Sequence, residues 1–340
     1  MKVFTGIIAV VVLCAALSFA GNIFAPVAFA LLVIAVGWPL QAVLHKRLPK
    51  MVAVLLTVVV TLALVSAVCY AVVWGFGHVA KWVFANGARF QAFYGQLGEW
   101  LEQHGFVLGT LVTEHFDMRF VFRLLQDVSV RLQGLFSFLV VTFVYVLLGL
   151  LEVDAVASQL RRMKAADTGA YLSAAAADAG RRLQKYMKVR TLMSVATGVV
   201  VWLFTLTAGL ELALAWGALA FGLNYIPFLG PFVATLLPTF FALVQFESWQ
   251  MALFVFASLN IIQFLSGSYI EPRIAGKTLA MSPFLVLFSV FFGAFLWGIS
   301  GAFIGVPVTI VILTFLSHHP ATRDAANVLS GTPAPEPEVP

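Results

Sequence analysis

Polar residues recur at helical spacing along one stretch of the chain that is otherwise apolar. They are separated by three, four and four positions, so in an α-helix they line a single face. A polar face of this kind is costly against lipid, but it is tolerated against a cavity or a neighbouring helix. The stripe therefore either lines a passage for a substrate or a proton, or makes interhelical hydrogen bonds worth about 0.6 kcal/mol each. Its members are Asn260, Gln263, Gly267 and Glu271.

Two other positions offer polar chemistry next to breaks in the apolar runs. Glu271 and Arg273 flank Pro272, and the carboxylate either carries a proton or, as we favour, accepts a hydrogen bond from the arginine and fixes the turn. Asn224 precedes a second break, where its amide oxygen suits a polar solute or an ion, although asparagine is equally suited to cap a helix. The predicted transport path also includes the residues that shape the backbone at the breaks, which are Pro227, Gly230, Pro231, Gly298 and Gly301.

No combination of residues points to an enzyme. A nucleophile, a base and an orienting group do not occur together, and the six histidines lack the spacing of metal ligands. Cys14 and Cys69 lie inside apolar runs, where they are expected as buried small side chains. The glycine-rich loops that bind nucleotide phosphates are missing from the sequence. We therefore predict no catalytic residues, no metal, no cofactor and no ATP-driven transport by this chain alone.

The composition identifies lipid as the solvent for most of the chain. Of 340 residues, 61% are apolar and only 10% are charged, whereas a typical soluble domain has roughly 25% charged residues. The net charge of +5 comes from short basic clusters between apolar runs, which is typical of the loops of membrane proteins. We therefore predict an all-α polytopic integral membrane protein that has the lipid bilayer as a partner and does not bind nucleic acid.

About eight membrane segments are expected, since roughly 20 helical residues cross the hydrocarbon core. A cleaved signal peptide is the alternative for the first of them. The predicted division of the chain is an N-terminal scaffold of three spans in 1–80, an amphipathic interfacial segment in 81–133, a fourth span and a basic cytoplasmic loop in 134–190, a transport core in 191–318, and a disordered cytoplasmic tail in 319–340.

The basic clusters assign sides of the membrane to these segments. Lysine and arginine stay on the cytoplasmic side, which places 154–190 inside and 81–133 outside. The run 212–246 must then start and end outside, and the run 280–316 must start and end inside. Each is either a pair of short spans or, as we prefer, a re-entrant helical hairpin, because arms of about 15–16 residues are only roughly 22–24 Å long.

The two hairpins have opposite orientations, and each follows a full span. Such an inverted repeat with broken helices at membrane depth is typical of secondary transporters. Non-helical backbone inside a bilayer must be buried in protein or reached by water, so the two breaks indicate a central site. A channel or a static scaffold contains the same parts, and both stay open as alternatives.

Two motifs carry a resemblance to a known family. Residues 224–231, NYIPFLGP, are similar to an N-x-I-P-x-x-G-P element, and residues 271–277, EPRIAGK, are similar to an E-P-x-x-x-G-K element. Together they resemble the AI-2E family transporters, over about residues 5 to 318. The resemblance implies an inner-membrane protein of seven or eight spans. It also implies export of autoinducer-2, as in some members, or sodium/proton or lithium/proton antiport, as in others, and it does not fix the substrate.

We predict a multi-pass permease of the bacterial inner membrane that exports a small polar metabolite or signal, such as autoinducer-2, by alternating access. Its partners are then a small-molecule or ion substrate and further copies of the chain in a homo-oligomer. A Na+(Li+)/H+ antiporter is the first alternative, although no aspartate lies inside a predicted span. The second alternative is a non-transporting membrane partner whose basic segment docks a cytoplasmic protein.

Overall fold

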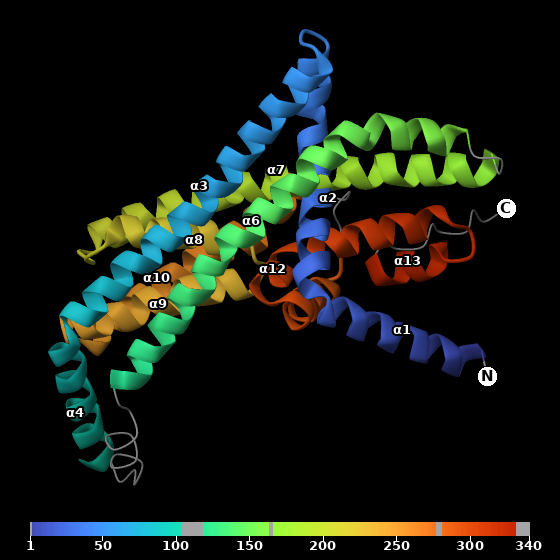
Figure 1. Ribbon diagram of the computed structural model, residues 1–340. Coiled ribbons are helices and arrows are strands. Elements are labelled where there is room, and N and C mark those ends of the chain that lie inside the picture. The colour runs from blue at the N-terminus through green and yellow to red at the C-terminus, as the bar shows by residue number, and fades with distance from the viewer. Residues whose placement is uncertain (1, 104–117, 163–165, 277–280, 331–340) are drawn as a thin grey trace. The chain divides into compact units, whose positions relative to one another are not determined.

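The computed structural model describes residues 2–103, 118–162, 166–276 and 281–330, and it is helical almost throughout these ranges (Figure 1). No strand occurs in them, so the prediction of an all-α protein is confirmed. The elements are α1 Lys2–Phe19, α2 Gly21–His45, α3 Lys50–Ala85, α4 Gly87–Gln103, α6 Met118–Arg161, α7 Ala166–Thr207, α8 Ala213–Leu223, α9 Leu229–Phe246, α10 Trp249–Phe264, the π-helix η1 Leu265–Ile270, α11 Glu271–Ala275, α12 Pro283–His318 and α13 Arg323–Ser330.

Seven stretches of the described chain are long and apolar enough to cross a bilayer, which confirms a polytopic membrane protein. Lengths of 18 to 40 residues suffice for the roughly 30 Å hydrocarbon core. They are Gly21–His45, Lys50–Ala85, Ser137–Leu160, Thr168–Thr207, Leu229–Phe246, Trp249–Ala275 and Pro283–His318.

Several helices extend beyond the apolar runs that predicted them. α6 runs through the fourth predicted span, 134–151, and past it at both ends, and α7 joins the basic stretch to the fifth span without interruption. Charged residues do not break a helix, and the alanines near the start of α7 favour one. The segment predicted as a basic loop is therefore helical up to Arg161 and again from Ala166.

The C-terminal tail differs from its prediction. Residues 319–340 were expected to be disordered, yet Arg323–Ser330 form α13, whose Ala326 is buried and which packs on α12. The proline-rich composition that indicates disorder begins only at Pro333. Residues 331–340 and 104–117 lie outside the described ranges.

The chain divides into two compact units. Unit 1 contains Met1–Val65, Ser137–Thr191 and Pro272–Pro340, and unit 2 contains Ser66–Phe136 and Leu192–Glu271. The first predicted hairpin thus belongs to unit 2 and the second to unit 1, which differs from the predicted grouping of both in one core, 191–318. The long helices α3, α6 and α7 contribute residues to both units, and a division by sequence blocks does not anticipate this.

In unit 1, α7 completes a backbone hydrogen bond that α2 lacks. Pro39 has no N–H group, so the carbonyl oxygen of Ala35, four residues earlier, loses its helical donor. The side-chain Nε2 of Gln184 donates to this oxygen at 2.9 Å. α2 also contacts α6, where the side chain of Gln41 donates to the carbonyl oxygen of Leu150. A glutamine in the basic stretch therefore holds α7 on α2.

Replacing Gln184 by leucine is expected to lower the free energy of unfolding by about 1–2 kcal/mol, because the Ala35 carbonyl is left without a donor. In a Pro39→Ala background the helix supplies its own N–H, and the same change is expected to cost less than about 0.5 kcal/mol. Thermal unfolding of the four detergent-purified proteins in this double-mutant cycle measures the difference. Equal costs in the two backgrounds would contradict the assigned role of Gln184.

Candidate transport site

The first predicted hairpin, 212–246, consists of two unequal helices in unit 2. α8 has 11 residues and α9 has 18, and the two pack against each other, with lengths of about 16 Å and 27 Å. The prediction of two similar arms is therefore wrong, and α9 is long enough to be one of the seven candidate spans. The break lies at 224–228, and Gly230 and Pro231 belong to the first turn of α9, where proline is tolerated.

The two ends of this hairpin lie next to each other. The Nε2 of Gln245 donates to the carbonyl oxygen of Gly209, and its Oε1 accepts from the backbone N–H of Glu211, both at 2.9 Å. The indole N–H groups of Trp82 and Trp216 donate to the side chain and the carbonyl oxygen of Glu211, respectively. Residue 245 thus returns to the starting point of the segment, so the chain enters and leaves the hairpin at one place.

The tip of the hairpin has a tightly specified backbone. Gly230 lies so close to the end of α8 that an added Cβ would overlap the carbonyl oxygen of Leu223. Phe228 has φ 61° and ψ −55°, and the Leu229 N–H donates to the Pro227 carbonyl oxygen at 2.6 Å. These values define the rarer, strained form of the γ-turn. The break is therefore held in a sparsely populated conformation, of a kind that clusters at functional sites.

A buried polar cluster lies against this break in unit 2. Asn224, which is 4% exposed, ends α8 and donates through Nδ2 to the Oγ of Ser194 at 3.3 Å. Thr197, one helical turn after Ser194 on α7, shares a hydrogen bond with Ser266. All four residues are less than 10% exposed. Side chains from α7, α8 and η1 thus meet in a small polar centre within an apolar bundle, which we call the polar cluster.

Close helix contact brings these groups together. An added Cβ at Gly198 would come within 2.7 Å of the Phe221 Cβ, and one at Gly217 within 2.5 Å of the Trp202 Cβ, so glycines allow α7 and α8 to approach. Ser194 and Gly198 form the small-x-x-x-small pattern that favours such packing.

Gln263 carries an unsatisfied polar group close in the chain to Ser266 of the polar cluster. It lies three residues before Ser266, and its Nε2 atom is buried without a hydrogen-bond partner in the part of the chain that the structure describes. Most buried polar atoms are paired, so an unpaired amide needs an explanation. A solute that accepts a hydrogen bond would supply one.

The π-helix η1 divides the predicted polar stripe. Because a π-turn holds more residues than an α-turn, positions after Leu265 no longer continue the face defined by Asn260 and Gln263. Asn260 is exposed, and its side chain donates to the carbonyl oxygen of Phe256 in its own helix. Of these two stripe residues, Gln263 has a buried side-chain amide nitrogen three residues before Ser266, whereas Asn260 is exposed.

The remaining members of the stripe and its flank lie at the junction that follows. Gly267 is exposed within η1, Glu271 is half-buried at the start of α11, and Pro272 and Arg273 are exposed in α11. These residues follow Ser266 of the polar cluster in the chain.

The second predicted hairpin, 280–316, is formed by α12 in unit 1. Its backbone leaves the helical conformation at Trp297 and at Gly298, where φ is 62° and ψ −140°. Residues 283–296 and 299–318 then pack against each other, since an added Cβ at Gly301 would overlap the carbonyl oxygen of Gly293. Farther from the turn, the hydroxyls of Ser289 and Thr309 share a hydrogen bond of 2.8 Å across the two arms. The predicted break at 298–301 thus begins one residue earlier, at Trp297.

The turn of α12 is tied to the N-terminal helices of the same unit. The indole N–H of Trp297 donates to the carbonyl oxygen of Leu17 at 2.9 Å. Gly21, at the start of α2, leaves room for this ring, because an added Cβ would come within 3.1 Å of it. The N-terminal helices α1 and α2 therefore support the second hairpin, and α2 is also one of the candidate spans.

The polar cluster contains hydroxyl and amide groups and no charged side chain among the residues named for it. Within the described ranges, no group of three or more His, Cys, Asp or Glu side chains is placed to hold a metal ion. The arrangement can donate and accept hydrogen bonds in a buried place, but it has no nucleophile activated by a base. It is suited to holding a polar solute.

Ser194, Thr197 and Ser266 were not predicted as site residues from the sequence, and the Ser194–Gly198 spacing by itself indicates only close helix packing. Each is a single hydroxyl residue within an apolar run, which resembles ordinary helix composition. The spacing of Ser194 and Thr197, one turn apart, is the one signal that marks a polar patch in α7. Their partners are 30 and 69 residues away in the chain.

Comparison with known proteins identifies the family of the chain. The model of the AI-2E family transporters matches residues 7–321. The AI-2 transport protein TqsA of Escherichia coli (strain K12) is 28% identical over 324 residues, which cover 94% of this chain and 93% of that protein. A proposed transport protein of Haemophilus influenzae is 24% identical over 335 residues, covering 95% of this chain and 94% of that protein. A proposed transport protein of Borreliella burgdorferi is 36% identical over 132 residues, covering 38% of this chain and 36% of that protein.

The structure shows where the two motifs that predicted the family lie. The first, 224–231, forms the tip of the hairpin beside the polar cluster, and the second, 271–277, begins directly after η1. With the family match over nearly the whole length of an all-helical, multi-pass membrane chain, the protein belongs to the AI-2E family of membrane transporters.

Proposed function

We propose that this protein is a secondary transporter of a bacterial inner membrane that exports a small polar metabolite or signal by alternating access. Autoinducer-2 is the first solute to test, because the relative TqsA is described as an AI-2 transport protein. The 28% identity over 324 residues supports this choice of solute.

The observation that carries the proposal is the polar cluster at the broken hairpin. Asn224, Ser194, Thr197 and Ser266 are buried polar residues in a chain of which 61% is apolar. The side chain of Gln263 adds a buried donor that no described residue uses. Because these groups are uncharged, they favour a neutral solute with hydroxyl or carbonyl groups over an ion that must be neutralised.

Two backbone elements beside the polar cluster support a conformational change. The γ-turn at Phe228 stores strain next to Asn224, and η1 carries Ser266 on a π-helix that can convert to α-helix by shifting one residue. A change in the first alters the bond from Asn224 to Ser194, and a change in the second alters the bond from Ser266 to Thr197. Either event opens the polar cluster, as alternating access requires.

Asn224→Ala is expected to reduce export of autoinducer-2 from loaded proteoliposomes at least tenfold, because it removes the side chain that joins the hairpin tip to α7. Asn260→Ala makes the same chemical change on α10, where the exposed side chain donates to the Phe256 carbonyl oxygen of its own helix, and it is expected to retain flux within twofold. Equal losses in the two variants would contradict a site at the polar cluster.

The same proteoliposomes test the antiporter alternative. A sodium jump across vesicles that contain a pH-sensitive dye reports proton movement coupled to sodium. The proposal expects no sodium-dependent proton flux in vesicles that export the solute. Proton flux without solute export would replace the proposed function by antiport.

A further inference from the structure

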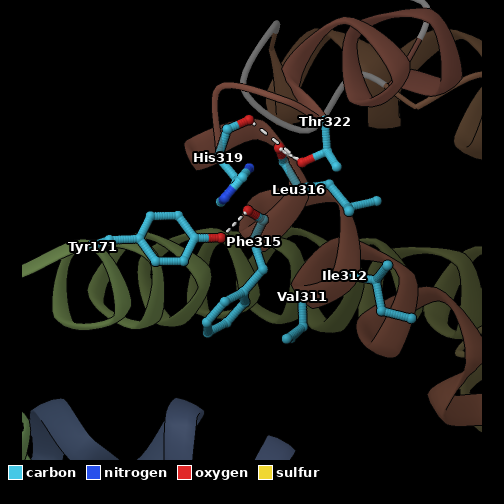
Figure 2. A pocket seen from close by; sticks show the side chains of 7 residues that line it. All are labelled: Tyr171, Val311, Ile312, Phe315, Leu316, His319 and Thr322. Atoms are coloured by element: carbon cyan, nitrogen blue, oxygen red, sulfur yellow. Dashed lines mark hydrogen bonds between the residues drawn. The ribbon is translucent and has the colours of Figure 1, made fainter. Parts of the chain in front are cut away.

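A cavity of about 460 Å³ lies in unit 1 between the early turns of α7 and the end of α12 (Figure 2). Val311, Ile312 and Phe315 form an apolar wall along the last turns of α12, and Tyr171, His319 and Thr322 line the polar end. It shares no residue with the polar cluster. Its size falls within the range of small-ligand sites.

The polar end is built on the C-terminus of α12. The hydroxyl of Tyr171 donates to the carbonyl oxygen of Phe315 at 2.6 Å, and that of Thr322 donates to the carbonyl oxygen of Leu316 at 2.8 Å. The last carbonyl groups of a helix have no donor within it; the Tyr171 hydroxyl satisfies that of Phe315, and the Leu316 carbonyl accepts from both the Thr322 hydroxyl and the His319 backbone N–H. Figure 2 shows both bonds at the rim of the cavity. The rim is therefore held by hydrogen bonds, one of which comes from Tyr171 on α7.

His319 provides a donor that this capping does not use. Its Nδ1 accepts from the backbone N–H of Ala321 at 3.3 Å, so in the neutral imidazole the proton is on Nε2. The imidazole ring packs on the ring of Tyr171 in a T-shaped arrangement, with a centroid distance of 5.8 Å. The Nε2–H group is then available for an acceptor in the cavity.

The cavity coincides with the end of a candidate span. Pro283–His318 is apolar enough to cross a bilayer, and the wall residues belong to its last turns, whereas His319 and Thr322 come after it. The wall therefore lies at the level of acyl chains and the rim at the level of headgroups, where amphipathic rings such as that of Tyr171 are favoured. A ligand that fills both parts must be apolar at one end and an acceptor at the other.

We propose that this cavity binds one phospholipid. An acyl chain packs on Val311, Ile312 and Phe315, and an ester or phosphate oxygen accepts a hydrogen bond from the Nε2–H of His319. A lipid bound there contacts both α7 and α12 and holds them together. The site is separate from the proposed solute site and does not depend on it.

Native mass spectrometry of the full-length, detergent-purified protein titrated with phosphatidylglycerol tests the proposal. Ile312→Trp fills the cavity and is expected to weaken retention of one lipid at least tenfold. His319→Phe keeps the ring but removes the donor, and a loss of roughly fivefold is expected for one hydrogen bond. Ile8→Trp is the matched control, because Ile8 on α1 is 49% exposed and Ile312 is 52% exposed, and it should retain the lipid within twofold.

Thermal unfolding establishes that each variant is folded, and Val311→Phe replaces Ile312→Trp if that protein is unstable. Unchanged lipid retention in the cavity-filling variant, or an equal loss in Ile8→Trp, overturns the proposal. Unchanged retention in His319→Phe overturns the assignment of the polar end. Loss of an oligomer in Ile312→Trp with lipid retention intact assigns the cavity to a second copy of the chain instead.

Discussion

Gly230→Ala is expected to destabilise the protein by about 3 kcal/mol and to abolish transport, because the new Cβ overlaps the carbonyl oxygen of Leu223. Overpacking costs typically about 1–3 kcal/mol, and here the obstacle is backbone, so rotation of a side chain cannot relieve it. Separation of α8 from α9 at this point also moves Asn224, which lies between the two helices. Thermal unfolding in detergent and solute export from proteoliposomes measure the two effects.

Gly180→Ala is the control for this substitution. Gly180 lies inside α7, and an added Cβ meets no atom within 4 Å, so alanine is expected to leave stability unchanged or to raise it by up to about 1 kcal/mol through helix propensity. A Gly230→Ala protein as stable as wild type would show that the hairpin tip is not packed as described.

Gly301→Ala is expected to have an effect of similar size on the second hairpin. Its Cβ would overlap the carbonyl oxygen of Gly293 on the opposite arm of α12, which forces the arms apart and costs about 3 kcal/mol. The Ser289–Thr309 hydrogen bond across the arms is lost with the separation. The loss appears as a lower unfolding temperature and as loss of export.

Gly77→Ala is the matched control for Gly301→Ala. Gly77 lies in α3 with open space around its Cβ position, so the substitution should not lower the unfolding temperature. If Gly301→Ala and Gly77→Ala unfold at the same temperature, the two arms of α12 do not form the close backbone contact on which the hairpin depends.

The positions of both breaks were predictable because they depend on local backbone chemistry. Proline at 227 removes a helical donor, and Gly298 adopts a positive φ of 62° that other residues rarely take. Charge and hydropathy were enough to identify the solvent and the candidate spans, since crossing a bilayer demands a long apolar helix.

Other features depend on contacts that local sequence does not report. The arms of the first hairpin are unequal because Gly230 and Pro231, which were expected to lie in the break, belong to the first turn of α9. The π-helix at 265–270 has no distinctive composition, so the stripe from Asn260 to Glu271 was predicted on one face. The polar cluster joins α7 to residues far along the chain, and only tertiary packing selects Ser194 and Thr197 from the other hydroxyl residues.

The accessibility of residue 224 tests the central claim, that the polar cluster is reached in turn from both sides of the membrane. Asn224→Cys is made in a protein whose two native cysteines are serine, and labelling by a charged, membrane-impermeant methanethiosulfonate is followed from each side. We predict labelling from both sides, although Asn224 is only 4% exposed in this conformation, and slower labelling when autoinducer-2 is saturating. Labelling from neither side would contradict the account, because the polar cluster would then be static packing.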